Sequence, residues 1–242
     1  MRSALNWLAA AFVILALARP ATAADDAAAR GAELLAQAKA ASGGAAWDQL
    51  GGWHESGAAI VSDTQGSYDT WCDLHRIGMT NHHVLGGASQ TRGFDGSVVW
   101  LDDGSNPVRV IQAPQALASA RQGAYVSAWG FFFPDRFVAQ RVYIGSTSAD
   151  GSDFDVVQVT PQDGLSMELW IDRKTHLVSR MVDRNGPKPA VAVLSDFRTI
   201  NGILTPFVVA ESDGDPRHTL ELHIAAIDFS PFDRARFAQP TR

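Results

Sequence analysis

The first regular pattern after the N-terminus is helical. From Ala27 to Ala41 apolar side chains recur on one face, and Ala, Leu, Gln, Glu and Lys dominate the composition. Asp25 or Asp26 can cap the start of this helix, and Gly43 and Gly44 can end it. A short further turn is predicted around residues 45–50.

From residue 53 onward the period changes from helical to two. Alternating apolar and polar positions predict strands, separated by hairpin dipeptides such as Asp95-Gly96 and Asn201-Gly202. The segments are Trp53–Ser62, Gly66–Arg76, Met79–Leu85, Ser89–Phe94, Val98–Leu101, Val108–Ile111, Val138–Ile144, Phe154–Thr160, Leu165–Ile171, His176–Arg184, Ala190–Arg198, Ile203–Glu211 and His218–Phe229.

Short turns between successive strands favour an antiparallel meander, and a sheet of roughly ten strands is too wide to stay flat. The sequence therefore predicts an α+β fold. Its elements are a curled antiparallel sheet, forming an unclosed half-barrel of roughly ten strands, and two or three helices on the concave side. No linker divides residues 24–242, so we expect one domain there.

One helix interrupts the strands and leads into an aromatic run. The pattern predicts a helix over Gln115–Trp129, with Pro114 in its first turn and Gly130 at its end. Three consecutive phenylalanines follow, Phe131, Phe132 and Phe133. Three consecutive rings cannot all face one core in regular structure, so at least one should be exposed or covered by something mobile. We expect residues 129–137 to form a mobile flap at the mouth of an apolar cavity.

The N-terminus carries the pattern of a secretory signal peptide. Met1 and Arg2 precede an apolar run of 12 residues, Trp7–Ala18, and an A-x-A site follows at 21–23. The run is shorter than the roughly 20 apolar residues that span a bilayer. The hypothesis is a signal peptide over residues 1–23, cleaved before Ala24. No cysteine follows for lipid attachment, so the mature protein is expected in the periplasm without a lipid anchor.

Composition and charge exclude several classes of protein. Hydrophobic residues make up 46% and charged residues 19%, which excludes intrinsic disorder. The net charge is −6, and it becomes −8 without Arg2 and Arg19, which argues against nucleic acid as a partner. A single cysteine, Cys72, excludes a disulfide scaffold. It shares a strand face with Tyr68 and Thr70 and is predicted to be a small core residue.

The sequence contains no recognisable catalytic or metal-binding constellation. His82 and His83 are adjacent, so on a strand they point to opposite faces, and His218 and His223 also fall on opposite faces. Phosphate-binding loops, nucleophile elbows and H-E-x-x-H or C-x-x-C motifs do not occur. We therefore expect a non-enzymatic protein with no catalytic residue, cofactor or metal.

The remaining candidates for function are aromatic side chains. Beneath helices on a curled sheet they could line an apolar cavity or its mouth, and ordinary core packing is the alternative for each of them. The candidate ligand-binding residues are Trp71, Trp100, Trp129, Phe131, Phe132, Phe133 and Trp170.

The order of several motifs resembles a known superfamily. The helix ends in A-A-S-G-G-A-A-W at 40–47, followed by G-F-D-G at 93–96, E-L-W-I-D at 168–172, S-D-F-R at 195–198 and N-G-I-L-T-P at 201–206. This resembles the LolA/LolB-like outer-membrane lipoprotein-sorting superfamily. The nearest resemblance is to the LolA-like domain that precedes retropepsin-like aspartic proteases in some bacterial periplasmic proteins. The D-T-G or D-S-G protease motif is absent, so no protease activity is carried over.

The resemblance implies an unclosed barrel, capped by helices, whose apolar interior takes acyl chains. It also implies a buried arginine that holds the lid, and Arg76 is the nearest candidate. The predicted function is thus an exported, non-enzymatic binder of a lipid, acyl chain or lipoprotein. The alternative is a periplasmic interaction, sensor or accessory module for a separately encoded protease, with a periplasmic or membrane protein as partner. The two differ in whether a sizeable apolar cavity is present.

Overall fold

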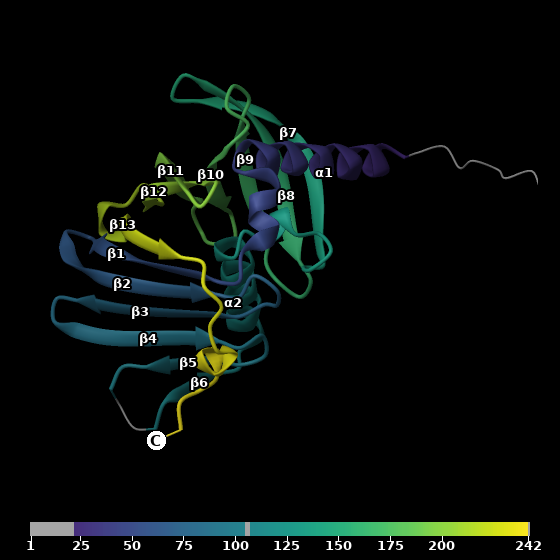
Figure 1. Ribbon diagram of the computed structural model, residues 1–242. Coiled ribbons are helices and arrows are strands. Elements are labelled where there is room, and N and C mark those ends of the chain that lie inside the picture. Colours follow the sequence, from purple (N-terminus) through teal and green to yellow (C-terminus); the bar gives the residue numbers. More distant parts are fainter. Residues whose placement is uncertain (1–21, 105–106, 242) are drawn as a thin grey trace, which may run out of the picture.

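A single antiparallel sheet dominates the computed structural model of the protein, which describes residues 22–104 and 107–241 (Figure 1). The first six strands are β1 (Trp53–Val61), β2 (Thr64–Cys72), β3 (Met79–Leu85), β4 (Ala88–Phe94), β5 (Val99–Asp102) and β6 (Arg109–Ile111). The others are β7 (Ala139–Ala149), β8 (Ser152–Pro161), β9 (Met167–Asp172), β10 (Val178–Asp183), β11 (Ala190–Ile200), β12 (Ile203–Ser212) and β13 (Leu220–Asp228). Most of the predicted signal peptide, residues 1–21, lies outside the described residues.

The sheet consists of two meanders joined at their centre. Strands β1–β6 follow one another on one side, strands β13–β7 follow on the other, and β1 pairs with β13 in between. Among the described residues the outer strands β6 and β7 do not pair with each other, so the curled sheet stays open. The prediction of an unclosed antiparallel half-barrel is confirmed. The described strands number thirteen, one for each segment with the period-two pattern, so the estimate of roughly ten was too low; even the short β5 and β6 join the ladder.

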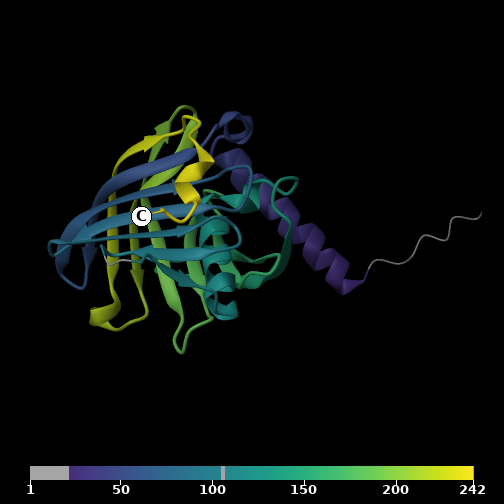
Figure 2. The ribbon, with the colours of Figure 1, turned by 90° about the horizontal axis from the view of Figure 1, so that it is seen from below.

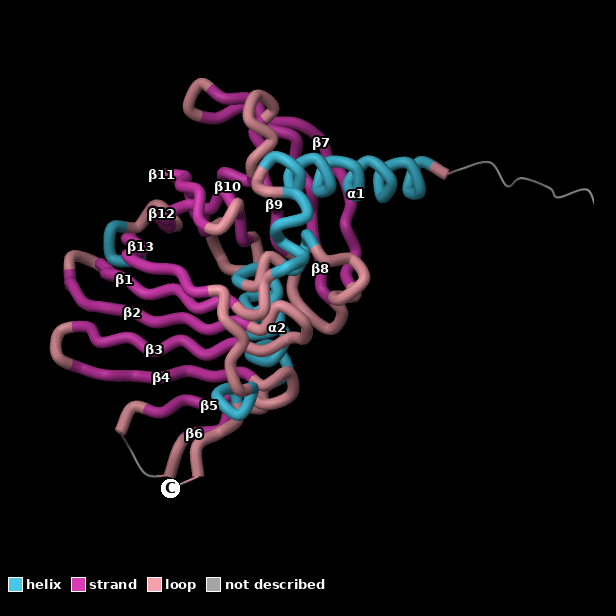
Figure 3. Tube along the Cα trace, viewed as in Figure 1, coloured by secondary structure: helices cyan, strands magenta, loops and turns pink. Residues whose placement is uncertain are grey.

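Two α-helices cover this sheet, and four short 3-10 helices complete the described fold. Helix α1 (Ala23–Ala41) packs against β7 and β8. Helix α2 (Pro114–Ser127) connects β6 to β7 and lies inside the curve of the sheet (Figures 1 and 2). Figure 3 shows the same layout coloured by secondary structure. The 3-10 helices are Gly44–Gln49, Gly130–Phe132, Pro216–His218 and Arg234–Phe237.

Helix α2 is tied to both meanders by hydrogen bonds. The guanidinium of Arg121 donates to the carbonyl of Gly96, in the turn between β4 and β5, at 2.8 Å. The amide of Gln122 donates to the carbonyl of Ser166, just before β9, at 2.7 Å. The helix therefore bridges the two outer parts of the open sheet and fixes the space beneath it.

The start of α1 differs from the sequence prediction. The helix begins at Ala23 rather than Ala27, because Thr22 caps it in place of Asp25 or Asp26. The Thr22 hydroxyl accepts from the backbone N–H of Asp25 at 3.3 Å, and the Asp25 carboxylate accepts from the N–H of Thr22 at 3.0 Å. This reciprocal pair satisfies two otherwise free donors at the helix start.

The end of α2 also differs from the sequence prediction. The helix ends at Ser127, and Trp129, not Gly130, takes the left-handed conformation, with φ of 51°. Gly130 is required for a different reason, since a Cβ there would lie 2.5 Å from the Tyr125 ring. We call residues 129–133, which form this change of direction, the aromatic turn.

All three phenylalanines of the aromatic turn are buried, with 1–3% of each residue exposed. The expectation was that at least one is exposed or covered by something mobile; its first alternative is wrong, because it assumed regular strand or helix. A 3-10 turn has three residues per turn, so successive side chains point in different directions. Phe131 packs on Tyr125, Phe132 on Trp47, and Phe133 lies beneath the ammonium of Lys39.

The aromatic turn belongs to a core cluster centred on Trp47. The Trp47 ring lies parallel to Trp53 with centroids 5.9 Å apart, and it packs against Trp129 at 5.4 Å and Phe132 at 5.2 Å. Its indole N–H donates to the hydroxyl of Ser42 at 3.0 Å, so the polar atom of the buried ring is satisfied. These aromatics fill the end of the half-barrel where α1, the aromatic turn and β1 meet.

Candidate functional site

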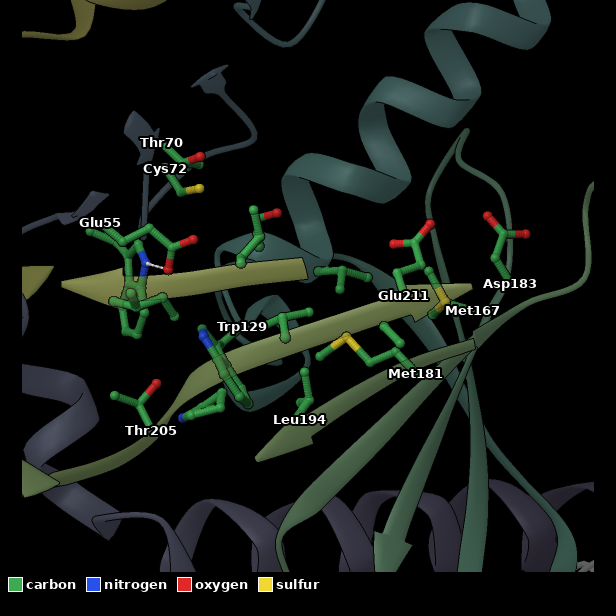
Figure 4. Close-up of a pocket in the computed structure, with 18 of the residues that line it drawn as sticks. Glu55, Thr70, Cys72, Trp129, Met167, Met181, Asp183, Leu194, Thr205 and Glu211 are labelled. Carbon is green, nitrogen blue, oxygen red and sulfur yellow. Dashed lines mark hydrogen bonds between the residues drawn. The ribbon is translucent and has the colours of Figure 1, made fainter. Parts of the chain in front are cut away.

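A cavity of about 270 Å³ lies between the concave face of the sheet and the C-terminal end of α2 (Figure 4). Strands of both meanders contribute to it: β1 and β2 from the first, and β9–β13 from the second. Its apolar walls include Trp53, Trp129, Met167, Met181, Leu194 and Val209. Unbranched methionine side chains adapt readily to irregular shapes, so the two methionines suit a wall that meets variable ligands.

Strand register explains why these residues face inward. Trp53 pairs directly with Cys72, and Glu55 pairs with Thr70, so both pairs lie on one face of the sheet. A bulge between Ser56 and Gly57 shifts the pairing of β1 with β13. The prediction that Cys72 is a small core residue is confirmed, since it is fully buried. Burial and the nearby Glu55 raise the pKa of its thiol, so it stays protonated and inert.

Glu55 brings a carboxyl group into this mainly apolar space. Its Oε2 accepts a hydrogen bond from the Trp53 indole N–H at 3.0 Å, drawn as a dashed line in Figure 4. Burial raises the pKa of Glu55 because the charged form loses its hydration. Next to it on β2, the Thr70 hydroxyl accepts from the Asn81 amide at 2.7 Å. One end of the cavity is therefore polar.

A pair of carboxyl groups lies at the opposite end of the cavity in Figure 4. Glu211 and Asp183 come from β12 and β10, near Met167 and Met181. Burial, and then the negative charge of Asp183, raise the pKa of Glu211. Gln122 of α2 donates to the Asp183 carboxylate at 3.3 Å. The cavity thus has polar ends and an apolar middle.

Of the aromatic candidates from the sequence, Trp129 is in the cavity wall. The three phenylalanines lie behind it: Trp129 stacks on Phe132 with centroids 5.7 Å apart and packs against Phe131 at 5.5 Å. The structure therefore brings the four aromatic side chains of the aromatic turn together, and of these four Trp129 contacts the cavity. The role of the phenylalanines in ligand binding stays a prediction.

Trp71, Trp100 and Trp170 lie away from the cavity. Trp71 stacks on His54 at 4.2 Å, on the outer face opposite Cys72, and Trp170 is on the face opposite the buried Leu169. Strand alternation places both outside. Trp100 is buried near the C-terminus, where its indole N–H donates to the carbonyl of Phe237 at 2.8 Å. These three do not line the cavity.

Arg76 does not have the burial that the resemblance implied. It is exposed in the loop between β2 and β3. Two other guanidinium groups lie beside the aromatic turn: that of Arg136 is 4.4 Å from the centre of the Phe133 ring, and that of Arg141 on β7 donates to the carbonyls of Phe137 at 3.0 Å and Ala139 at 3.1 Å. The sequence analysis missed Arg141 because its partners are backbone carbonyls, which leave no side-chain pattern.

Glu55 is the most informative residue that the sequence analysis missed. The sequence did contain a signal, because Glu55 shares a strand face with Trp53 and Gly57, and the other positions on that face are apolar or small. A carboxylate on the buried face of a strand is uncommon and marks either a paired charge or a functional group. The pairing of Trp53 with Cys72 was needed to show that this face is the concave one.

Neither a cluster of metal-binding side chains nor a membrane-spanning helix occurs in the described residues. In residues 22–104 and 107–241, no group of three or more His, Cys, Asp or Glu side chains is arranged to hold a metal ion. Within the same residues, neither α-helix has the length and apolar character needed to cross a bilayer.

Similarity to known proteins exists at the level of structure. No family model matches the sequence, and a search of curated proteins finds no significant match. A LolA superfamily protein from Nitrosomonas europaea superposes with a TM-score of 0.56 and 13% identity, over 85% of this chain and 96% of that one. A DUF1329 family protein from Desulfovibrio piger superposes with a TM-score of 0.56 and 16% identity, over 88% of this chain and 97% of that one.

A domain assigned to outer membrane lipoprotein sorting, from Vibrio parahaemolyticus, gives a TM-score of 0.52 and 13% identity, over 84% of this chain and 93% of that one. Together with the open thirteen-stranded sheet of the described residues, these similarities in structure define the fold. The chain has the LolA-like fold.

Proposed function

We propose that this protein is an exported, non-enzymatic binder that takes the alkyl or acyl chain of a lipid or lipoprotein into the cavity beneath α2. The observation that carries the proposal is the cavity itself, whose middle is walled by Trp129, Met167, Met181 and Leu194. Burying a chain there releases water from apolar surface on both sides, which is the main driving force for such binding.

The size of the cavity favours one chain rather than several. At about 270 Å³ it is just below the roughly 300–1,000 Å³ of typical small-molecule sites. A single chain fits without rearrangement, whereas a lipid with several chains would have to push the walls apart. An interaction module would not need this open apolar space, so the cavity supports the binder over the alternative.

Titration with dodecanol, a neutral single-chain amphiphile, tests the proposal. Trp53 and Trp129 line the cavity, so the ligand should change their fluorescence. We expect a saturable change that fits one ligand per protein, and isothermal calorimetry should give the same stoichiometry. A change that rises linearly without saturation would contradict the proposal.

Export to the periplasm is a further part of the proposal. N-terminal sequencing of protein recovered from a periplasmic extract is expected to begin at or next to Ala24. Cleavage there removes Thr22, so the start of α1 would depend on Asp25 and Asp26, whose charges favour a helix N-terminus. Protein that starts at Met1 and stays in the inner-membrane fraction would show that residues 1–23 act as an anchor.

A further inference from the structure

The charged groups that line the cavity all have one sign. Glu55, Asp183 and Glu211 contribute carboxyl groups, and no Lys, Arg or His is among the described residues that line it. A chain that carries its own carboxylate, such as a fatty acid, would add a fourth carboxyl group to these three. Negative charges that approach one another repel, and the repulsion is strongest beside the buried Glu55 carboxyl, where water screens it least; Glu211, at the other end, is exposed to solvent.

An unsatisfied hydroxyl provides a second, independent observation. Thr205 lines the cavity and is only 1% exposed, and its Oγ1 has no hydrogen-bond partner among the described residues. A buried hydroxyl without a partner is costly, and such groups in native proteins are usually completed by a ligand or water. In Figure 4 Thr205 lies at the same end of the cavity as Glu55.

Glu55 likewise has capacity for a further partner. The hydrogen bond from Trp53 engages Oε2. Figure 4 draws no hydrogen bond from the residues shown to the other carboxyl oxygen. Two acceptors, the Glu55 carboxylate and the Thr205 hydroxyl, therefore lie at one end of an apolar space. A group that offers several N–H donors and a positive charge satisfies both.

We infer that the cavity selects a single-chain amphiphile with an ammonium head, which Glu55 and Thr205 bind while the chain lies along Trp129, Leu194 and Met181. This inference rests on the proposed function and specifies its ligand class. Glu211 and Asp183, at the other end, add negative potential that attracts a cation and repels an anion. An ammonium donates three hydrogen bonds, which offsets part of its lost hydration.

Three ligands with the same alkyl chain test the inference: dodecylammonium, dodecanol and dodecanoate, each below its micelle concentration at neutral pH. In the wild-type protein we expect dodecylammonium to bind at least tenfold more tightly than dodecanol, and dodecanoate to bind most weakly. Glu55→Gln should reduce the preference for ammonium over alcohol to within about threefold.

A matched control is available on the outer face of β13. Glu221 pairs with Ile60 of β1, outside the cavity, and its Oε1 lies 2.6 Å from Nε2 of His223. Glu221→Gln changes the net charge by the same amount, so it should keep the full preference for ammonium. A loss of preference in both variants would mean that overall charge, and not Glu55, is responsible, and would overturn the inference.

The failures of the two proposals can be told apart. If none of the three ligands binds, the proposed function itself is wrong. If all three bind with similar affinity, or dodecanoate binds most tightly, the cavity is a chain-binding site and the inference about its head group is wrong. The wild-type ranking alone decides this, so the test stands even if Glu55→Gln does not fold.

Discussion

Replacing both Phe132 and Phe133 with alanine is expected to leave the protein largely unfolded at room temperature. Both rings are buried in the cluster around Trp47. Truncating one buried phenylalanine costs about 3–5 kcal/mol, and natural domains have about 5–15 kcal/mol in total. The two losses will not be fully additive because the residues are neighbours. Even so, most of the stability of the fold should be lost.

Denaturant unfolding followed by circular dichroism measures this effect. The single variants should each lower the unfolding midpoint strongly. Val138→Ala is the control, since Val138 follows the same segment but is 72% exposed, and its truncation should change stability by at most about 0.5 kcal/mol. If the double variant instead unfolds like the wild type and alters only ligand binding, residues 129–137 are the mobile flap that the sequence predicted.

The sequence predicted the strands of this fold well, but it did not predict the conformation of residues 129–133. Alternating strands and hairpin dipeptides predicted the curled antiparallel sheet, and β3 has the predicted bounds, Met79–Leu85. Period-two patterns identify strands because one face of each is buried. The conformation of the aromatic turn was missed because its backbone follows neither the helical period nor the period of two of a strand. The left-handed conformation at Trp129 is rare for a large residue and is stabilised by tertiary packing.

The candidate site was harder to predict than the fold. Trp129 was identified, but Glu55, Thr205 and Leu194 reach the cavity from strands far apart in the sequence. Which face of each strand is concave depends on its partners, and the bulge at residues 56–57 alters the register locally. Neither feature can be read from one sequence without the pairing.

The second large effect is expected from filling the cavity. Ala192 lies on β11, pairs with Met181 on one side and Glu211 on the other, and lines the cavity. Ala192→Trp would place an indole in the space meant for a chain. Excluding four methylene groups at about 0.8 kcal/mol each costs about 3 kcal/mol, which is a loss of at least about 100-fold in dodecanol affinity. The neighbouring methionines should adapt to the ring, so the fold should persist.

The matched control for this variant is Ala226→Trp. Ala226 lies on β13, pairs with Ser56, and is exposed on the outer face. Ala226→Trp adds the same side chain outside the cavity, so it should leave the affinity for dodecanol within twofold of that of the wild type. Equal affinity in the two variants would place the ligand somewhere other than this cavity.

Native mass spectrometry of protein purified from the periplasm without detergent tests the central claim most directly. The claim predicts that the wild type and Ala226→Trp each carry one bound amphiphile, seen as a mass above that of the chain and released by collisional activation. Ala192→Trp should show the mass of the chain alone. A wild-type protein without any bound amphiphile, or the same amphiphile retained by Ala192→Trp, would contradict it.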